Sequence, residues 1–408
     1  MLLLYKRLNP RAIRQKRMLD NSHAQLLSLY LHIPFCKTRC TYCAFNTYTN
    51  AEVYLPAYVA ALRNELRWLG AVTQQPVHTI FFGGGTPSLL SPSQIADILH
   101  TCRTAFQIVP ELEITLEVNP FSVTGDYFER VRAAGVNRLS IGMQSVHRSE
   151  LRLMARDHDA EAVPRTVRVA RAAGFENINL DLIFALPYQT LGMWQESLRA
   201  ALDLQPQHLS LYALELESGT AMTRDVERGR LPLPDEELAA QMYEVADAVL
   251  AQHGFEQYEI SNWARPGWEC RHNLQYWRNL PYLGVGAGAH GYANGIRYAV
   301  VRAIPRYIAL ANAQSAPLPF PFTASVEWHE VIDTQTAMLE HLLTGLRLVR
   351  DGVRESEFEA RFGVSLLDIF GKPFERLRAQ GLLQREGETW RLTSSARLIS
   401  NRVFTALL

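Results

Sequence analysis

The sequence has few cysteines, no net charge and no long run of apolar residues. Its five cysteines, three of them clustered, do not match the dispersed even pairs of a disulfide framework, so we expect a protein of the reducing cytoplasm. Forty-one basic and 41 acidic side chains cancel, which argues against nucleic acid as a partner. Because no stretch reaches about 18 apolar residues, we expect neither a membrane span nor a cleavable signal. A length of 408 residues with 48% hydrophobic composition allows one large domain and one or two smaller ones.

Residues 1–27 form a basic extension, which is the one local charge anomaly. A single acid, Asp20, stands against six basic side chains: Lys6, Arg7, Arg11, Arg14, Lys16 and Arg17. Terminal segments of this composition are usually solvated, so we expect an appendage. Any membrane contact through anionic lipid would be peripheral.

Strand-like runs alternate with helix-like segments over the first half of the chain. Period-two and β-branched runs predict strands at 28–33, 78–83, 113–118, 138–143, 177–183 and 208–214. Apolar residues spaced by three and four predict helices at 54–70, 91–106, 124–135, 161–174 and 190–204. Such alternation implies right-handed crossovers and a parallel sheet covered by helices. We therefore predict an α/β fold, a partial (β/α)6 barrel left open because a full barrel has about eight units.

The unusual residues of the sequence follow the predicted strands. The clustered cysteines come after the first strand, "GGGTP" after the second, and Glu117, Gln144 and Asp181 at or near the ends of the next three. The C-terminal ends of parallel strands share one face, so residues spread over about 150 positions are expected to converge there. Glu117, Gln144 and Asp181 suit ribose hydroxyls and an amino group, and Arg156 suits a carboxylate.

Three cysteines, Cys36, Cys40 and Cys43, lie within "LHIPFCKTRCTYCAFN". Their CxxxCxxC spacing lets three thiolates from one loop point toward one centre. A closed zinc site needs a fourth ligand, and His32 lies upstream on a strand that can turn it away. A 4Fe-4S cluster held by three cysteines instead leaves one iron open to an exogenous ligand. The spacing favours the cluster over zinc, with Phe45 either shielding it or simply packing beside the loop.

The glycine run 83–85 exposes backbone groups that a ligand can approach closely, because no Cβ intervenes. Alone it is a weak signal. It matches neither the phosphate-binding loop nor the dinucleotide spacing, which disfavours a nucleoside triphosphate or NAD.

With these features in place, the sequence resembles the radical S-adenosylmethionine superfamily. From residue 30 onward it is similar to the branch that contains oxygen-independent coproporphyrinogen III oxidase and the HemW heme chaperones. The segments that carry this resemblance are "YLHIPFCKTRCTYCAFN", "FFGGGTPSLL", "LEVNP", "RLSIGMQS", "RDHD", "NLDLIFALP" and "YEISNWARPG".

The resemblance implies a set of cofactor ligands. Cys36, Cys40 and Cys43 would hold a 4Fe-4S cluster, whose open iron the methionine part of S-adenosylmethionine would chelate. The remaining contacts to S-adenosylmethionine would come from Tyr30, Tyr42, Gly84, Gly85, Thr86, Glu117, Gln144, Arg156 and Asp181.

Two features separate the branches of this family. The decarboxylating oxidase resembles CxxxCxxCxC, whereas this chain has Phe45 at the last cysteine position, as the HemW pattern does. The HemW pattern also has HNxxYW, which here is "HNLQYW" with His272, Asn273, Tyr276 and Trp277.

The HNxxYW motif could form a heme site. A histidine in a loop seldom binds heme, but an imidazole can ligate the iron while aromatic rings pack on the macrocycle. With the resemblance to the HemW pattern, we therefore predict heme as a third cofactor. Cys270 is expected to be a buried thiol rather than a further ligand.

The C-terminal part is read as several helices followed by a hairpin around "REGETWRLT", a small helical, winged-helix-like domain. Its balanced charge argues against DNA binding, and the resemblance implies a cap over the open barrel. Two features depart from the family pattern: the length of the basic extension and Ala396 in place of a frequent glycine. We divide the chain into the extension 1–27, the radical SAM partial barrel 28–258, a sheet extension with HNxxYW at 259–325, and the C-terminal domain 326–408.

The first function that we expect is a cytoplasmic heme chaperone. It would bind heme, a 4Fe-4S cluster and S-adenosylmethionine, and would transfer heme to an acceptor protein such as a respiratory one. The alternative is a radical SAM enzyme that acts on a porphyrinogen or another tetrapyrrole, as in oxygen-independent coproporphyrinogen III oxidase. Phe45 and "HNLQYW" count against the enzyme. The third hypothesis is a zinc-stabilised barrel that only binds proteins.

Overall fold

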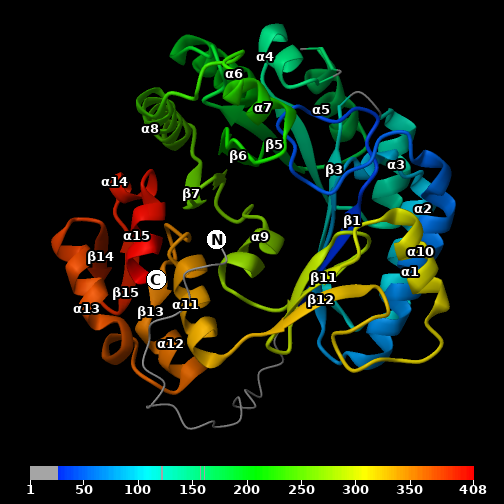
Figure 1. Cartoon of the computed structure of the whole chain (residues 1–408). Coiled ribbons are helices and arrows are strands. Elements are labelled where there is room, and N and C mark those ends of the chain that lie inside the picture. The colour runs from blue at the N-terminus through cyan, green and yellow to red at the C-terminus, as the bar shows by residue number, and fades with distance from the viewer. Residues whose placement is uncertain (1–25, 121–122, 157, 160) are drawn as a thin grey trace.

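The structure is a computed structural model that describes residues 26–408 apart from 121, 122, 157 and 160. The predictions for the basic extension 1–27 therefore fall, except at its last two residues, outside the described residues. Figure 1 shows a strongly curved sheet with helices on its outer side and a smaller helical unit facing the open side.

Six parallel strands, adjacent in sequence order, form the centre of a 12-stranded sheet. They are β1 (Leu27–Ile33), β2 (Val77–Gly84), β3 (Ile108–Val118), β4 (Arg138–Gln144), β5 (Asn177–Phe184) and β6 (His208–Ala213). The predicted partial (β/α)6 barrel is confirmed. β3 begins at Ile108 rather than at residue 113, because Ile108 already pairs with Val77 of β2. The sequence did not predict this start because Pro110 interrupts the alternation of apolar and polar residues.

Helices follow the first five strands on the outer side of the sheet (Figure 1). Ser91 begins the second helix with a capping box, and Gly135, at φ +112°, ends the third in the left-handed conformation that glycine favours. The five helices are α1 (Leu55–Val72), α2 (Pro92–Ala105), α3 (Gly125–Ala134), α5 (Ala162–Ala172) and α6 (Leu191–Asp203). Shorter or later elements are η1 (Glu52–Tyr54), η2 (Pro87–Leu89), α4 (Arg148–Leu153), α7 (Ala221–Glu227) and α8 (Glu236–Gln252).

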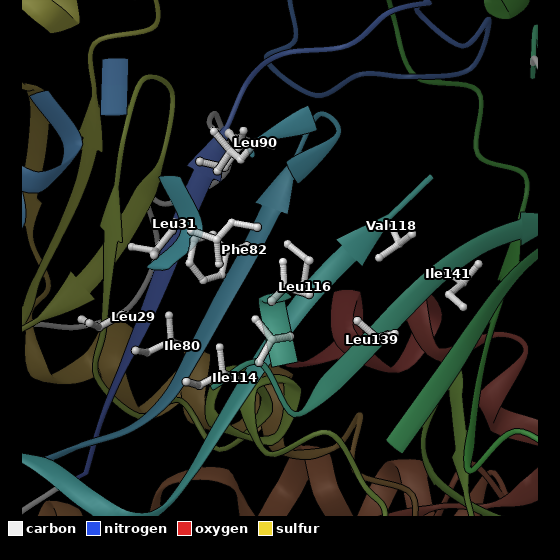
Figure 2. Close-up of a cluster of buried hydrophobic side chains, with 14 of the residues drawn as sticks. Leu29, Leu31, Ile80, Phe82, Leu90, Ile114, Leu116, Val118, Leu139 and Ile141 are labelled. Carbon is white, nitrogen blue, oxygen red and sulfur yellow. The ribbon is translucent and has the colours of Figure 1, made fainter. Parts of the chain in front are cut away.

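The two faces of the curved sheet differ in polarity because side chains alternate along each strand. The outer face is apolar and packs on the helices; Figure 2 shows Leu29 and Leu31 of β1, Ile80 and Phe82 of β2, and the matching residues of β3 and β4. The inner face carries buried polar and charged side chains: Ser28, Thr79, Glu113, Thr115, Arg138, Ser140, Asn179, His208 and Ser210. The concave side is therefore suited to polar ligands as well as to hydrogen-bonded packing.

Six further strands extend the sheet at both ends. At one end β8 (Asn262–Ala264) and β7 (Glu256–Glu259) add to β6, and at the other end β9 (Tyr282–Val285) runs parallel to β1. β10 (His290–Ala293), β11 (Ile296–Val300) and β12 (Val326–Val331) continue from β9, with α10 (Ile304–Ala313) between the last two. Among the described residues no strand pair joins β7 to β12, so the barrel stays open. α9 (Arg271–Trp277) lies inside the curve (Figure 1).

The C-terminal unit has its own hydrophobic core, which includes Phe358, Phe374 and Trp390. Its three-stranded sheet has the order β13-β15-β14, and the predicted hairpin is present. The elements are α11 (Thr334–Gly345), β13 (Val353–Arg354), α12 (Glu355–Phe362), α13 (Leu366–Ala379), β14 (Leu383–Glu386), β15 (Thr389–Leu392), α14 (Ser394–Arg397) and α15 (Ser400–Leu407). In the part of the chain that the structure describes, no helix is long and apolar enough to cross a membrane.

Candidate functional site

The cysteine loop leaves the C-terminal end of β1 and is fixed to the barrel at several points. The backbone N–H of Cys36 donates to the carbonyl of Tyr48 at 3.0 Å. Thr41 donates its hydroxyl to the carbonyl of Leu153 at 2.8 Å, and its own carbonyl accepts from the N–H of Met222 at 2.9 Å. These bonds hold the loop in place from both sides before any ligand is bound.

Two donors from other loops reach the thiols, one after β2 and one after α4. The Thr86 hydroxyl lies 3.6 Å from Cys36 Sγ, and Arg156 Nη1 lies 3.6 Å from Cys40 Sγ. Burial raises the pKa of the Cys36 thiol to about 11 and also raises the pKa of Cys43. A buried thiol of this kind becomes a thiolate only beside a strong positive charge, which a metal centre supplies.

The donor set fits a cluster better than a single zinc ion. Among the described residues, no three His, Cys, Asp or Glu side chains are grouped closely enough to hold one ion. Zinc would need each sulfur at about 2.3 Å, whereas a cluster spreads its ligands over separate irons. His32 is already engaged, because its Nε2 lies 3.0 Å from the Asn46 carbonyl and its Nδ1 lies 3.1 Å from the Tyr30 hydroxyl. Three thiols without a fourth ligand leave one iron of a cluster open.

The glycine run is required by the protein's own packing. A Cβ on Gly85 would lie 2.6 Å from the Phe35 carbonyl oxygen and 3.0 Å from Cys36 Sγ. A Cβ on Gly84, at φ +110°, would lie 2.5 Å from the His32 ring. The sequence suggested that these glycines admit a ligand, and the structure shows that they also let the second strand end touch the cysteine loop.

Two half-buried carboxyl groups, Glu117 and Asp181, lie on the inner face beside this loop. Glu117 accepts a hydrogen bond from the Gly84 N–H at 3.2 Å. Burial, and then the charge of Asp181, raise the pKa of Glu117 to about 8. Asp181 accepts from Ser140 at 3.0 Å and from Asn179 at 2.8 Å, and burial raises its pKa as well. Glu117 has little compensation from the protein, as expected of a group that receives a polar or cationic ligand.

Arg156 crosses the site from the segment after α4. Its Nη2 donates to the Gly142 carbonyl at 2.9 Å, while its Nε is buried and has no hydrogen-bond partner among the residues that the structure describes. A Cβ on Gly142 would lie 2.3 Å from that Nη2, so Gly142 is needed to admit the guanidinium. Gln144 ends β4 in the left-handed region, at φ +63°. The prediction missed Gly142, although it lies within the recognised "RLSIGMQS"; Asp157 of "RDHD" lies outside the described residues.

The remaining predicted contacts are distributed around the loop. Tyr30 is tied to His32, and burial, with the charge of Glu117, raises its pKa. Tyr42 packs on a small apolar cluster that includes Leu151 and Met154. Phe45 is 66% exposed. The expectation that Phe45 packs beside the loop is therefore wrong in this structure, because the segment after Cys43 turns its side chain into solvent.

The HNLQYW segment is a helix, not a loop, and it is buried inside the curved sheet. His272 is 1% exposed, and its ring stacks on Phe81 at 5.0 Å. Both ring nitrogens are bonded: Nδ1 lies 2.7 Å from the Thr79 hydroxyl and Nε2 lies 2.8 Å from the Tyr276 hydroxyl. Burial lowers the pKa of His272 to about 3, so this imidazole is neutral.

Glu113, which the sequence interpretation did not select, fixes the start of this helix. Its carboxylate accepts from the backbone N–H groups of Arg271 and His272, both at 3.1 Å, and lies 3.8 Å from the Arg271 guanidinium. It thereby replaces the missing side-chain cap of Cys270, whose buried thiol has a pKa of about 12. The alternation in "EITLE" does place Glu113 and Glu117 on one face, and this was the available signal.

The far end of α9 meets the C-terminal unit. The Arg347 guanidinium lies 4.4 Å from the centre of the Trp277 ring, whose Nε1 is buried without a partner. Asn273 hydrogen-bonds the Tyr258 hydroxyl. His272 and Tyr276 therefore contact each other and the inner face of the barrel, while Trp277 contacts the C-terminal unit. The cysteine loop lies at the opposite, C-terminal end of the strands.

Comparisons with known proteins agree with this geometry. The Radical SAM superfamily matches residues 30–201, and the HemN C-terminal domain matches residues 332–399. Heme chaperone HemW of Mycobacterium tuberculosis is 39% identical over 94% of this chain and 95% of its own length. Heme chaperone HemW of Bacillus subtilis is 38% identical over 93% of this chain and 99% of its own length.

A solved structure shares the whole fold. Coproporphyrinogen III oxidase (HemN) from Escherichia coli has a TM-score of 0.80 and 24% identity, and the match covers 94% of this chain and 90% of that one. The likeness shows the architecture of both the barrel and the C-terminal unit. Together with the full-length relatives, it leads to one conclusion: this chain belongs to the radical S-adenosylmethionine superfamily and, within it, to the family of heme chaperone HemW.

Proposed function

We propose that this protein binds heme and passes it to an acceptor protein. The observation that carries the proposal is the match to proteins named Heme chaperone HemW, 34–39% identical over 93–94% of this chain. The similarity covers the cysteine loop, the α9 segment and the C-terminal unit together. Phe45, at the position where the oxidase pattern has a further cysteine, supports the same choice.

The cluster ligands in this proposal are Cys36, Cys40 and Cys43. Arg156 and Thr86 would stabilise thiolate charge, since each places a donor 3.6 Å from a sulfur. When bound, a 4Fe-4S cluster supplies one-electron transfer to S-adenosylmethionine. The proposed contacts to that cofactor are Tyr30, Tyr42, Gly84, Gly85, Thr86, Glu117, Gln144, Arg156 and Asp181.

The carboxyl of Glu117 gives the proposed S-adenosylmethionine site a pH dependence. Its pKa of about 8 keeps the empty site largely uncharged at this residue near pH 7. S-adenosylmethionine carries a permanently cationic sulfonium, which would favour the ionised carboxylate in the same site, so that binding would release a proton from Glu117. Affinity for the cofactor should therefore rise as the pH increases toward about 8.

The proposed heme ligand is His272, and its tautomer follows from the hydrogen-bond network. Thr79 donates its hydroxyl hydrogen to Ser28, so His272 Nδ1–H donates to Thr79. The lone pair on Nε2 then accepts from the Tyr276 hydroxyl at 2.8 Å. Nε2 is the nitrogen that would ligate iron, provided that Tyr276 moves away. Asn273 and Trp277 would support the segment from its two sides.

Two substitutions test this ligand. If His272 binds the iron, His272→Ala should lose stoichiometric heme uptake in an absorbance titration, whereas Tyr276→Phe should retain it because Nε2 is freed. Thermal unfolding of both variants reports any structural damage. Stoichiometric uptake by a folded His272→Ala protein would contradict the assignment.

The cluster ligands are tested by anaerobic reconstitution with iron and sulfide. The wild type should hold about four irons per chain. Cys40→Ser should lose the cluster, and Cys102→Ala, at a fully buried cysteine in the outer core, should keep it. Zinc in the purified protein, with no iron taken up on reconstitution, would instead support the zinc-stabilised barrel.

A further inference from the structure

An open cleft of about 780 Å³ lies between the end of α9 and the C-terminal unit. Arg278 and Leu280, which directly follow HNLQYW, line one side, and residues of α11, α12 and the turn before β13 line the other. Its size is within the range of small-molecule sites. None of the residues so far assigned to the cluster or to S-adenosylmethionine lines it. We call it the arginine cleft.

The arginine cleft is lined mainly by arginines and their ion-pair partners. Two acids, Asp351 and Glu357, line it together with five arginines: Arg278, Arg350, Arg354, Arg361 and Arg391. Asp351 is shared, because it pairs with Arg278 at 3.0 Å and with Arg350 at 3.3 Å. Glu357 lies 3.7 Å from Arg354. Carboxylates just outside the lining also pair with these arginines: Glu269 with Arg350, Glu388 with Arg354 and Glu386 with Arg391. In the part of the chain that the structure describes, Arg361 is the one arginine of the cleft without a carboxylate partner, and it is there that an anionic ligand is favoured.

Arg361 is the least compensated of the five. Its Nη2 donates to the Asn279 carbonyl at 2.7 Å, and its Nη1 lies 3.3 Å from the Arg278 carbonyl. Among the residues that the structure describes, no carboxylate forms an ion pair with it. Burial lowers the pKa of Arg361, and the interactions with Tyr292 and Glu340 offset this only in part. A bound carboxylate would supply the missing partner.

A histidine beside Arg361 adds a second donor. His341 Nδ1 lies 3.2 Å from Arg361 Nη1, and because a guanidinium only donates, Nδ1 must accept. Burial lowers the pKa of His341 to about 3, so the ring is neutral and its proton is on Nε2. Arg361 and His341 both line the cleft and both carry N–H donors, which are the groups that carboxylate recognition requires.

The other part of the lining is apolar. Leu280, Leu348 and Val353 lie along the cleft, next to the ring of Trp277, which packs with Leu348. An apolar wall beside guanidinium groups fits a ligand that carries carboxylates at one edge of a flat hydrophobic body. Heme has this form, with two propionates at one edge of its macrocycle.

We propose that the arginine cleft binds the propionate carboxylates of heme, with Arg361 as the principal partner and Arg278, which would exchange Asp351 for a propionate, as the second. This inference rests on the proposed heme-binding function, and it does not depend on which residue ligates the iron. The backbone of 277–280 is held by Arg361 and joins the cleft to HNLQYW. Heme carboxylates in the cleft would therefore lie at the end of the motif that identifies the heme-binding branch.

The test compares two ligands on four proteins. Heme and heme dimethyl ester, which has the same macrocycle and iron but no free carboxylates, are titrated by absorbance into the reconstituted wild type. Arg278→Gln and Arg361→Gln are the cleft variants. Arg402→Gln, at an exposed arginine of α15 in the same C-terminal unit, is the matched control. Thermal unfolding confirms that each variant is folded.

Each cleft variant should bind heme about tenfold more weakly than the wild type, as expected when one charge-assisted contact is lost. Affinity for the ester should not change, and Arg402→Gln should match the wild type for both ligands. If the folded cleft variants bind heme as tightly as the wild type, the inference about the cleft is wrong and the proposed heme-binding function is unaffected. Equal losses for heme and ester would also overturn it, because the carboxylates would then not be the groups recognised. A wild type that takes up no heme would contradict the proposed function itself.

Discussion

Glu113 and Glu117 lie four residues apart on the inner face of β3, and their surroundings differ sharply. Glu113 accepts two backbone N–H groups of α9 and lies 3.8 Å from the Arg271 guanidinium. Buried Arg138 also interacts with it. Glu117 has one hydrogen bond, from Gly84, and faces the charge of Asp181.

The comparison separates a structural carboxylate from one that is available to a ligand. The chain itself satisfies Glu113, so its charge stabilises the packing of α9 inside the barrel. Glu117 is not satisfied by the chain, and burial raises its pKa to about 8. Buried acids with little compensation tend to lie where a ligand completes them. Glu113 therefore stabilises the packing of α9, and we propose that Glu117, on the same face of β3, serves ligand binding.

Glu113→Ala should produce the largest change. It removes the cap of α9 and takes one of two interacting carboxylates from Arg138, which is 2% exposed and then keeps only that of Asp181. Breaking a buried charged network typically costs about 3–5 kcal/mol. Denaturant unfolding of the cofactor-free protein measures this loss. The matched control, Glu111→Ala at an exposed position of the same strand, should change stability by less than about 0.5 kcal/mol. Equal effects of the two substitutions would contradict the structural role of Glu113.

Glu117→Gln should change binding rather than destabilise the fold. Affinity for S-adenosylmethionine at pH 8.5 should fall about tenfold, measured on the reconstituted protein. The pKa of Glu117 is about 8 in the folded protein and about 4.5 when the chain is unfolded. Between these pH values the unfolded chain ionises and the folded protein does not, so the wild type loses stability as the pH rises. The variant lacks this cost, so its melting temperature relative to the wild type should increase from pH 5 to pH 8. A variant that is less stable than the wild type at pH 8 would show that Glu117, like Glu113, stabilises the fold.

Asp181→Asn should have the smallest effect of the three. The charge of Asp181 is the second cause, after burial, of the raised pKa of Glu117. Removing it should lower that pKa below about 8, so the pH midpoint of S-adenosylmethionine binding moves downward. Binding measured at intervals between pH 6 and pH 9 gives the midpoint. An unchanged midpoint would show that the two carboxyl groups are not coupled.

The sequence predicted the barrel and the location of the cysteine loop because their signals are local. Six strands had recognisable alternation, and polar residues followed them directly. Glu113 shared that alternation but was not selected, because its partners are backbone groups of α9, more than 150 residues away in the chain.

The added strands and α9 could not be placed from local patterns. β7 to β12 have three to six residues each, and β9 pairs with β1 although all six parallel strands separate the two in the sequence. HNLQYW lies in a helix of seven residues that depends on a distant glutamate for its cap, so a loop was the natural expectation. The arginine cleft joins residues of two units and has no sequence motif.

The most direct test of the central claim is a transfer experiment. Reconstituted, heme-loaded protein is mixed with a heme-free acceptor protein, and heme on the acceptor is measured by absorbance after separation, while S-adenosylmethionine cleavage is assayed in the same samples. The account predicts that heme moves to the acceptor with little cleavage. Turnover of coproporphyrinogen with brisk cleavage, and no heme retained or transferred, would contradict it and make the protein a radical SAM enzyme.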